Sequence, residues 1–381
     1  MDKQNFETFI DYGSSKIRLG VFDKSVVKQN FFLEKRCLSD FKLKNFNIEE
    51  SEKILEELVL QAEKKLGVHL KNINLMVDTP DLFSIDVSIK KELDGKKVDL
   101  DDVKYLLRDA KILIQNNYND KKIIHIIVEK IIFDDQVFFS YPEEKIDCKK
   151  LILEIKFICF SNAVYKQINE KFKKNHLLIS NIYCSSYVKS FHYNRLFDNY
   201  DKKFFLDIGY KKTCLTVFEN KKLVFILTLP VGGNHITKDI SKVIGINESD
   251  AEKIKCELNK SNTIFSDNSE EELLKRVIYA RIDEILNLSL KNMSNLNMIN
   301  ENKKSILVFT GEGSKILDKN SIYLKDELSI FKDMNFYEEN NISITQSGFN
   351  FNKSDDNFEV NIVPKKLKKL GFFERFFHFF S

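Results

Sequence analysis

Two apolar runs flank a polar turn in the stretch FFLDIGYKKTCLTVF, residues 204–218. The first run ends in Asp207-Ile-Gly209, and the second begins at Thr213. Apolar runs of this length around a glycine-bearing turn predict a strand–turn–strand unit. Glycine lets backbone N–H groups approach an anion closely, and a threonine hydroxyl adds a donor. The stretch therefore has the features of a phosphate-binding loop.

The same pattern occurs earlier in the chain, in FETFIDYGSSKIRLGVF, residues 6–22. Its aspartate, Asp11, precedes Asp207 by 196 positions (207 − 11), and this internal repeat predicts two similar halves that face each other. An aspartate at each strand end could hold the water shell of a Mg²⁺ ion. The turn itself offers the donors Gly13, Ser14, Ser15 and Lys16.

Two further glycine segments follow in the second half. Residues 230–239, PVGGNHITKD, predict a turn at Gly232 and Gly233 that leads into a helix. Residues 305–316, SILVFTGEGSKI, predict a strand and then a loop whose amides could contact a nucleobase or a ribose. The polar and glycine positions of that loop are Thr310, Gly311, Gly313 and Ser314. The chain contains neither GxxxxGK[ST] nor GxGxxG, which argues against the P-loop and Rossmann classes.

Composition excludes several classes of protein. The 381 residues are 43% hydrophobic and 31% charged, as expected for a globular protein of two or more domains. A net charge of +3 is too small for a nucleic-acid-binding surface, so we expect no nucleic-acid partner. The six cysteines form no CxxC pair and predict reduced thiols. No signal peptide and no apolar run of transmembrane length are expected. His125, within the run IIHII, is predicted to be a strand residue that faces a polar side.

Together the four segments resemble the actin–hexokinase–chaperone ATPase superfamily and, within it, the FtsA family of bacterial cell-division proteins. Residues 10–16, IDYGSSK, look like the first phosphate loop of that family, and residues 206–209, LDIG, begin the second. The stretch that ends in AEKIK, residues 251–255, is similar to a family segment whose Glu and Lys reach the ribose, which implies that role for Glu252 and Lys255. Residues 310–314, TGEGS, look like the adenosine motif. Two departures are the YKK of residues 210–212, where Gly-Gly-Thr is usual, and Glu312, where glycine is expected.

The resemblance implies an α/β actin-like ATPase fold with two lobes of related topology, an inserted small α/β subdomain (SHS2-type, 1C) and a C-terminal amphipathic helix. The implied parts are a first half at 1–83 and 161–200, the insertion at 84–160, a second half at 201–230 and 300–351, an outer lobe at 231–299, a flexible linker at 352–364 and the terminal helix at 365–381.

The terminal stretch KKLKKLGFFERFFHFFS, residues 365–381, is amphipathic if it is helical. Its apolar part would be on the order of 17 Å long, too short to cross a hydrocarbon core of about 30 Å, but it could lie in a membrane interface with its lysines near anionic headgroups. A helix docked on its own domain is the alternative. The predicted membrane residues are Lys365, Lys366, Lys368, Lys369, Leu370, Phe372, Phe373, Phe376, Phe377, Phe379 and Phe380.

The resemblance also implies ATP as cofactor, with Mg²⁺ held through water near Asp11 and Asp207. Residues 184–190 lack a Pro, Glu or Gln that could position a water, so we expect at most slow hydrolysis. The implied function is to bind the C-terminal tail of FtsZ, to anchor FtsZ polymers to the cytoplasmic face of the inner membrane at the septum, and to self-associate and bind other division proteins. A small-molecule kinase or ATPase and a pilus-assembly actin-like protein are the alternatives. The implied nucleotide-binding residues are Asp11, Gly13, Ser14, Ser15, Lys16, Asp207, Gly209, Thr213, Gly232, Gly233, Glu252, Lys255, Thr310, Gly311, Gly313 and Ser314.

Overall fold

The computed structural model describes residues 6–24, 28–36, 48–142, 144–219, 221–258, 268–295, 304–317 and 328–354. The chain divides into two compact units. The first consists of Met1–Ile85, Asp120–His125 and Ile158–Asn357, and the second of Asp86–Asn119, Ile126–Phe157 and Phe358–Ser381. Each unit is described by itself.

The first unit contains two five-stranded sheets with the same topology. In each, an antiparallel three-stranded meander is extended by two parallel strands. This symmetry confirms the predicted repeat of two related halves. The first sheet has the order β3-β2-β1-β4-β9, with β1 at Phe6–Tyr12, β2 at Lys16–Asp23, β3 at Lys28–Arg36, β4 at Asn72–Met76 and β9 at Leu178–Tyr183. The second has the order β12-β11-β10-β13-β14, with β10 at Lys202–Ile208, β11 at Thr213–Glu219, β12 at Lys222–Leu229, β13 at Ser305–Thr310 and β14 at Asp333–Phe336.

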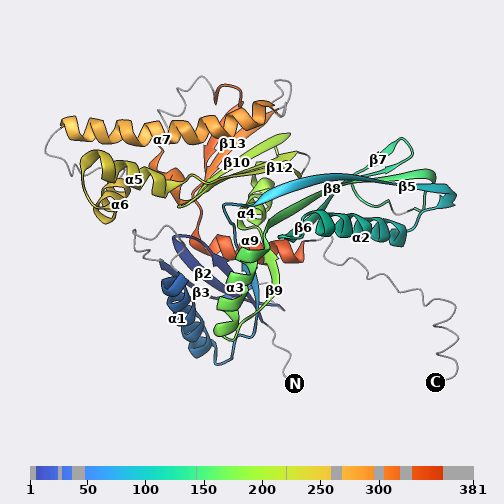
Figure 1. The fold of residues 1–381 in the computed structure, drawn as a ribbon, viewed down its shortest axis with the longest axis horizontal. Helices are drawn as coiled ribbons and strands as arrows, with labels where there is room; N and C mark the ends of the chain where they lie inside the picture. The colour runs from blue at the N-terminus through green and yellow to red at the C-terminus, as the bar shows by residue number, and fades with distance from the viewer. Residues whose placement is uncertain are drawn as a thin grey trace. The chain divides into compact units, whose positions relative to one another are not determined.

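Helices α1 (Ile48–Leu66) and α3 (Asn162–Lys174) share a hydrophobic core with the first sheet (Figure 1). Leu55, Leu58 and Ala62 of α1 recur at helical spacing and are fully buried, because this spacing places them on one face. Further contacts come from α9 (Asn341–Lys353), whose Phe349 stacks on Phe22 of β2 with ring centroids 4.5 Å apart. Helix α4 (Ser185–Asn194) and the short helix η1 (Arg195–Phe197) follow β9 and lead to the second sheet.

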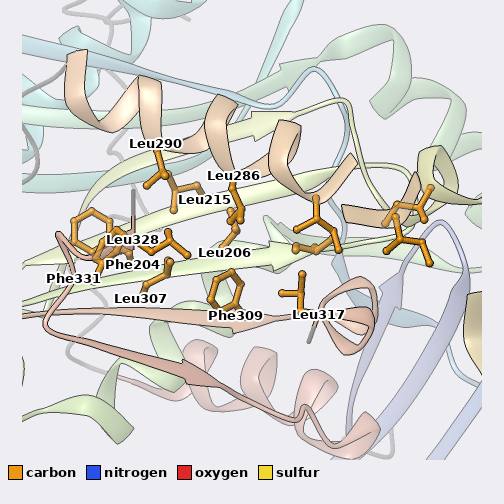
Figure 2. Close-up of a cluster of buried hydrophobic side chains, with 14 of the residues drawn as sticks. Phe204, Leu206, Leu215, Leu286, Leu290, Leu307, Phe309, Leu317, Leu328 and Phe331 are labelled. Carbon is orange, nitrogen blue, oxygen red and sulfur yellow. The ribbon is translucent and has the colours of Figure 1, made fainter. Parts of the chain in front are cut away.

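The second sheet shares its core with α5 (Gly233–Ile244), α6 (Glu248–Glu257) and the long helix α7 (Asn268–Asn295). Figure 2 shows Leu286 and Leu290 of α7 beside Phe204, Leu206 and Leu215 of the sheet. Each such side chain contributes about 1.5–3 kcal/mol on full burial. The core thus holds β10 in place, and the turn after β10 begins from a rigid strand. Beyond β13 lies the short helix η2 (Glu312–Ile316).

The second unit is a small α/β arrangement. Its four-stranded sheet has the order β5-β8-β6-β7, from β5 at Phe83–Lys97, β6 at Lys121–Phe133, β7 at Gln136–Phe138 and β8 at Asp147–Ser161. Helix α2 (Leu100–Asn117) begins with a capping box, in which Asp99 and Asp102 each accept the other's backbone N–H. All described residues of this unit fall within the predicted insertion at 84–160.

One prediction for a side chain is wrong. His125 does not face a polar side, because it is 1% exposed and lies against the rings of Tyr183, Tyr187 and Phe351. Its Nε2 accepts a hydrogen bond of 2.8 Å from the backbone N–H of Cys184. The histidine therefore caps the start of α4 from within the core.

Residues 355–381, with most of the predicted linker and all of the predicted terminal helix, lie outside the described residues. Among the helices that the structure describes, none has the length and apolar character needed to span a membrane.

Candidate functional site

The three glycine segments of the second half meet at the turn between β10 and β11. Gly311 has a φ of +82°, a conformation that side-chain-bearing residues rarely adopt. A Cβ atom there would collide with the Asp207 carboxylate and lie 2.6 Å from the carbonyl oxygen of Ile208. A Cβ on Gly313 would lie 2.7 Å from the same oxygen. Both glycines are required so that the loop after β13 can pack directly on the end of β10.

Gly232 and Gly233 pack on the other side of this turn. A Cβ on Gly232 would lie 2.6 Å from the carbonyl oxygen of Gly209 and 2.7 Å from the backbone nitrogen of Lys212. The N–H of Gly233 donates to Gly209 O at 2.9 Å, and that of Asn234 donates to Tyr210 O at 2.7 Å. The first amides of α5 therefore donate hydrogen bonds to carbonyl groups of the turn. Gly232 and Gly233 allow the two backbone segments to approach closely enough for these bonds.

The predicted ribose residues form a cluster beside the first turn of α5. Lys255 Nζ donates to the carbonyl of Gly233 at 3.0 Å and pairs with Glu252 Oε2 at 2.6 Å. Thr237, one turn into α5, contacts both side chains. The cluster fixes α6 against α5 and places Glu252 and Lys255 near the glycine turn.

Three other predicted residues are engaged locally. Thr213 is fully buried, and its hydroxyl donates to Val231 O at 2.8 Å. Thr310 ends β13 opposite Asp207 in the parallel ladder, and the Ser314 hydroxyl donates to Gly311 O at 2.7 Å. These contacts hold the loops in place.

The first turn contributes a lysine that reaches the second half. Gly13, Ser14 and Ser15 are half-buried, whereas Lys16 is 5% exposed. The Lys16 ammonium pairs with Glu34 of β3 at 3.2 Å and with Glu312 of η2. The ion pair between Lys16 and Glu312 links the first phosphate-type turn directly to the predicted adenosine loop.

Asp11 is paired with partners from its own half. Arg18 lies opposite it on β2 and donates from Nη1 to Oδ2 at 2.8 Å, while the Ser185 hydroxyl donates to Oδ1 at 2.7 Å. Burial by itself lowers the pKa of Arg18, but the nearby carboxylates of Asp11, Glu34 and Glu312 outweigh it and raise that pKa. The guanidinium therefore stays charged and holds Asp11 in a buried ion pair.

Asp207 is paired with a lysine from the other half. Lys189 of α4 lies 2.7 Å from Asp207 Oδ2 and 3.1 Å from Glu339 Oε1. The Tyr193 hydroxyl also donates to Glu339 at 3.0 Å, and Ser186 Oγ lies 3.1 Å from Asp207 Oδ2. Burial by itself lowers the pKa of Lys189, yet the two carboxylates raise it well above its ordinary value. Burial raises the pKa of Glu339, against the opposing effect of Lys189.

A third buried pair joins Asp78, which follows β4, to Lys212 of the second turn at 2.6 Å. Asp78 also accepts hydrogen bonds from the Ser186 hydroxyl and the Cys184 thiol. Burial by itself raises the pKa of Asp78, but Lys212 and these donors outweigh it and hold that pKa well below its ordinary value. Lys212 thus bridges the two halves.

Sequence reasoning found the turns but missed most of these partners. It named Lys16, and it did not identify Arg18, Asp78, Lys189 and Glu339. Arg18 had a usable signal, because a hairpin that pairs Tyr12 with Ile17 must place Arg18 opposite Asp11. Lys189 had no such signal in the sequence, because its partners Asp207 and Glu339 lie 18 and 150 positions away (207 − 189 and 339 − 189) on other elements.

The residues present fit an anionic ligand better than a metal ion. The half-buried first turn and the ammonium of Lys16 suit phosphate oxygens, and Glu312, whose side chain is 38% exposed, can leave Lys16 without the penalty of crossing a core. A hydrated Mg²⁺ between Asp11 and Asp207 does not fit, because each carboxylate already carries a buried cation. Among the described residues, no cluster of three or more Asp, Glu, His or Cys side chains is placed to hold a metal.

The pair of Asp78 and Lys212 predicts acid sensitivity. A carboxyl whose pKa is lowered by folding stabilises the protein above its unfolded pKa of about 4, and this stabilisation is lost as pH falls below that value. Urea unfolding at a series of pH values should show that Asp78→Asn removes part of the acid-induced loss of stability. Asp94→Asn, which removes an exposed carboxylate, should follow the unchanged chain. An Asp78→Asn profile parallel to that of the unchanged chain would contradict the assignment.

Comparison with known sequences points to one family. Residues 204–320 match the family model described as cell division protein FtsA. The FtsA protein of Streptococcus pneumoniae is 22% identical over 271 residues, a match that covers 67% of this chain and 56% of that protein. The FtsA protein of Bacillus subtilis is 21% identical over 265 residues, with 64% and 58% covered. The chain thus spans less than two thirds of the length of these two relatives.

Comparison with solved structures shows the fold. A chain of the PilM–PilN type IV pilus biogenesis complex superposes with a TM-score of 0.62 at 11% identity, with 89% of each chain covered. MreB5 of Spiroplasma citri bound to ADP gives a TM-score of 0.50 at 11% identity, with 92% of this chain and 97% of that chain covered. At these identities the likeness concerns the fold alone, which is that of the actin-like ATPases.

Proposed function

We propose that this FtsA-like chain is an actin-like cell-division protein that binds ATP between its two halves and anchors FtsZ polymers to the inner membrane. The single observation that carries the proposal is the pair of Asp-x-Gly turns on two sheets of identical topology, in a chain whose sequence matches FtsA. An adenine nucleotide suits this arrangement, and MreB5, which shares the fold, has been solved with ADP.

The phosphates would lie by the two turns and the nucleoside by the loop after β13, near Gly311, Gly313, Glu252 and Lys255. The nucleotide supplies charge and shape that favour one arrangement of the halves. We propose that hydrolysis is slow at most, because α4 presents the ion-paired Lys189 toward Asp207. The same pairing weighs against a kinase, since Asp11, Asp78 and Asp207 all carry cations and are poor general bases.

The proposed membrane contact is the segment 365–381, on the inner face of the cytoplasmic membrane at the septum. Burial of its six phenylalanines in the membrane interface would contribute on the order of 10 kcal/mol. The entropy cost of ordering the segment offsets a large part of this free energy. Attachment is therefore reversible.

The proposed protein partners are the C-terminal tail of FtsZ, further copies of the chain and other division proteins. The second unit is our candidate for contacts with neighbouring copies and other division proteins. Its helix α2 exposes Tyr105, Ile112 and Leu113, each at 40% or more. Apolar side chains gathered on one helix are typical of protein-binding surfaces.

One experiment tests the anchoring role. Polymerised FtsZ is sedimented with vesicles of phosphatidylethanolamine and phosphatidylglycerol, with and without the full chain. We expect FtsZ to co-sediment with vesicles only when the chain is present. The double variant Phe376→Glu with Phe377→Glu should abolish recruitment, because it places charge on the apolar side of the predicted helix.

The matched control is Glu374→Ala with His378→Ala, which changes the predicted polar side and should recruit normally. Recruitment by the phenylalanine variant would contradict the membrane helix. Failure of the unchanged chain to bind FtsZ without vesicles would contradict the division role. That second result would favour the pilus-assembly alternative, for which the likeness to the PilM–PilN complex is the supporting observation.

A further inference from the structure

We propose that Arg18 and Lys189 take the place of a divalent cation in this site, so that the chain binds the phosphates of an adenine nucleotide without Mg²⁺. The inference rests on the proposed function, because it concerns how the same site holds its ligand. It departs from the expectation that Asp11 and Asp207 hold a hydrated metal.

The first argument is the occupancy of Asp11. Its two carboxylate oxygens accept from different donors, Arg18 at 2.8 Å and Ser185 at 2.7 Å. The side chains of Asp11 and Arg18 are each 8% exposed, so little water reaches the pair. Arg18 is further held by Glu34 at 2.9 Å. A water shell around Mg²⁺ would have to displace a guanidinium that has a second carboxylate anchor.

The second argument is the occupancy of Asp207. Lys189 of α4 pairs with Asp207, and its ammonium also pairs with Glu339 at 3.1 Å. If the Asp207 carboxylate rotated toward a metal, the Lys189 ammonium would still lie beside Asp207, because its ion pair with the buried Glu339 holds the ammonium there. A divalent ion there would face a positive charge at short range with little screening. The ammonium thus occupies the Asp207 oxygen that a hydrated metal would need.

The third argument concerns the remaining acidic group. Asp78 is a further buried carboxylate near the turns, and Lys212 holds it at 2.6 Å. The cation sites of the three acids are therefore all filled by side chains of the chain, from β2, α4 and the turn between β10 and β11.

The ligand's own charge would be met by Lys16. Its side chain is 6% exposed, and its ammonium pairs with Glu34 and Glu312. Of these two, Glu312 is the more exposed, at 38% against 19%. A phosphate oxygen that replaces the Glu312 carboxylate keeps Lys16 paired and returns Glu312 to water, so no buried charge is left alone. The exchange needs no metal.

The test measures binding of ATP to the full chain by calorimetry, once with Mg²⁺ and once with EDTA. We expect the two dissociation constants to agree within about threefold. Binding that is tenfold or more tighter with Mg²⁺ would overturn the inference and leave the proposed nucleotide site intact. No binding under either condition would overturn the nucleotide site itself, so the two failures are distinguishable.

A variant provides a second readout. Lys189→Met frees Asp207, so binding should become dependent on Mg²⁺, provided that far-ultraviolet circular dichroism shows a folded protein. Lys203→Met is the matched control, since Lys203 is also a buried lysine of the first unit but bonds to Asn194 O and Asp198. Its binding should remain independent of Mg²⁺. A folded Lys189→Met protein that binds equally with and without Mg²⁺ would contradict the role assigned to Lys189.

Discussion

Gly311→Ala is expected to lower the free energy of unfolding by about 2–4 kcal/mol and to weaken ATP binding by about 100-fold or more. Two effects add. The residue has a φ of +82° and a ψ of 160°, a region that essentially only glycine occupies and that costs a side-chain-bearing residue about 1–3 kcal/mol. Its new Cβ would also collide with Asp207 and lie 2.6 Å from Ile208 O, so the loop after β13 must move away from β10. That movement separates the two segments that the proposed nucleotide contacts together.

Gly245 provides a control with a positive φ but without close contacts, in the left-handed region at a ψ of 26° rather than at the ψ of 160° of Gly311. Gly245 ends α5 with a φ of +77°, and nothing lies within 4 Å of a Cβ built on it. Gly245→Ala should therefore lose only the conformational part, about 1 kcal/mol, and should bind ATP normally. Urea denaturation and calorimetry of both variants separate the two effects. Equal losses of stability in the two variants would show that the close packing at Gly311 has no energetic weight.

The glycines of the two Asp-x-Gly turns, Gly13 and Gly209, mark what the sequence could predict. Asp-x-Gly after an apolar run indicates where a strand ends and a tight turn begins, because a Cβ on Gly13 or Gly209 would lie 3.0 Å or less from a carbonyl oxygen of the same turn. Both turns and their sheets were therefore predictable, and so was the amphipathic α1, whose Leu55, Leu58 and Ala62 recur at helical spacing.

The ion pairs could not be predicted in the same way. A lysine is ordinarily a surface residue, and nothing beside Lys189 in the sequence indicates burial. Its environment is created by Asp207 and Glu339, which only the folded chain brings together. His125 was misread for a related reason. It interrupts an apolar run, which suggests a polar side, but the backbone N–H of Cys184 satisfies its Nε2 inside the core.

These ion pairs also connect the two halves of the first unit. Lys16 with Glu312, Asp78 with Lys212 and Lys189 with Asp207 each join a residue on the first sheet's side to one on the second. The two halves are therefore connected by side chains near the proposed phosphate positions. A ligand that replaces Glu312 as the partner of Lys16 breaks one of these three ion pairs and leaves the other two in place. Nucleotide binding would therefore adjust the angle between two halves that remain joined.

The strongest test of that connection is Lys189→Met, which we expect to lower the free energy of unfolding by about 3–5 kcal/mol. The substitution keeps a long side chain but leaves Asp207 and Glu339 buried without their shared cation. Lys275→Met removes a lysine that lies 2.6 Å from its partner Glu271, close to the 2.7 Å between Lys189 and Asp207, but this pair is solvent-exposed, so stability should hardly change.

The pH dependence of this deficit distinguishes a lost charge from lost packing. Burial raises the pKa of Glu339 and Lys189 opposes that rise, so removal of Lys189 raises the pKa further. The carboxyl then takes up a proton at mildly acidic pH, and the uncompensated charge disappears. Urea unfolding should show that the difference between Lys189→Met and the unchanged chain narrows as pH is lowered from neutral. A deficit that stays constant with pH would mean that Lys189 stabilises the fold through its methylene chain, and its assignment as a built-in cation would then fail.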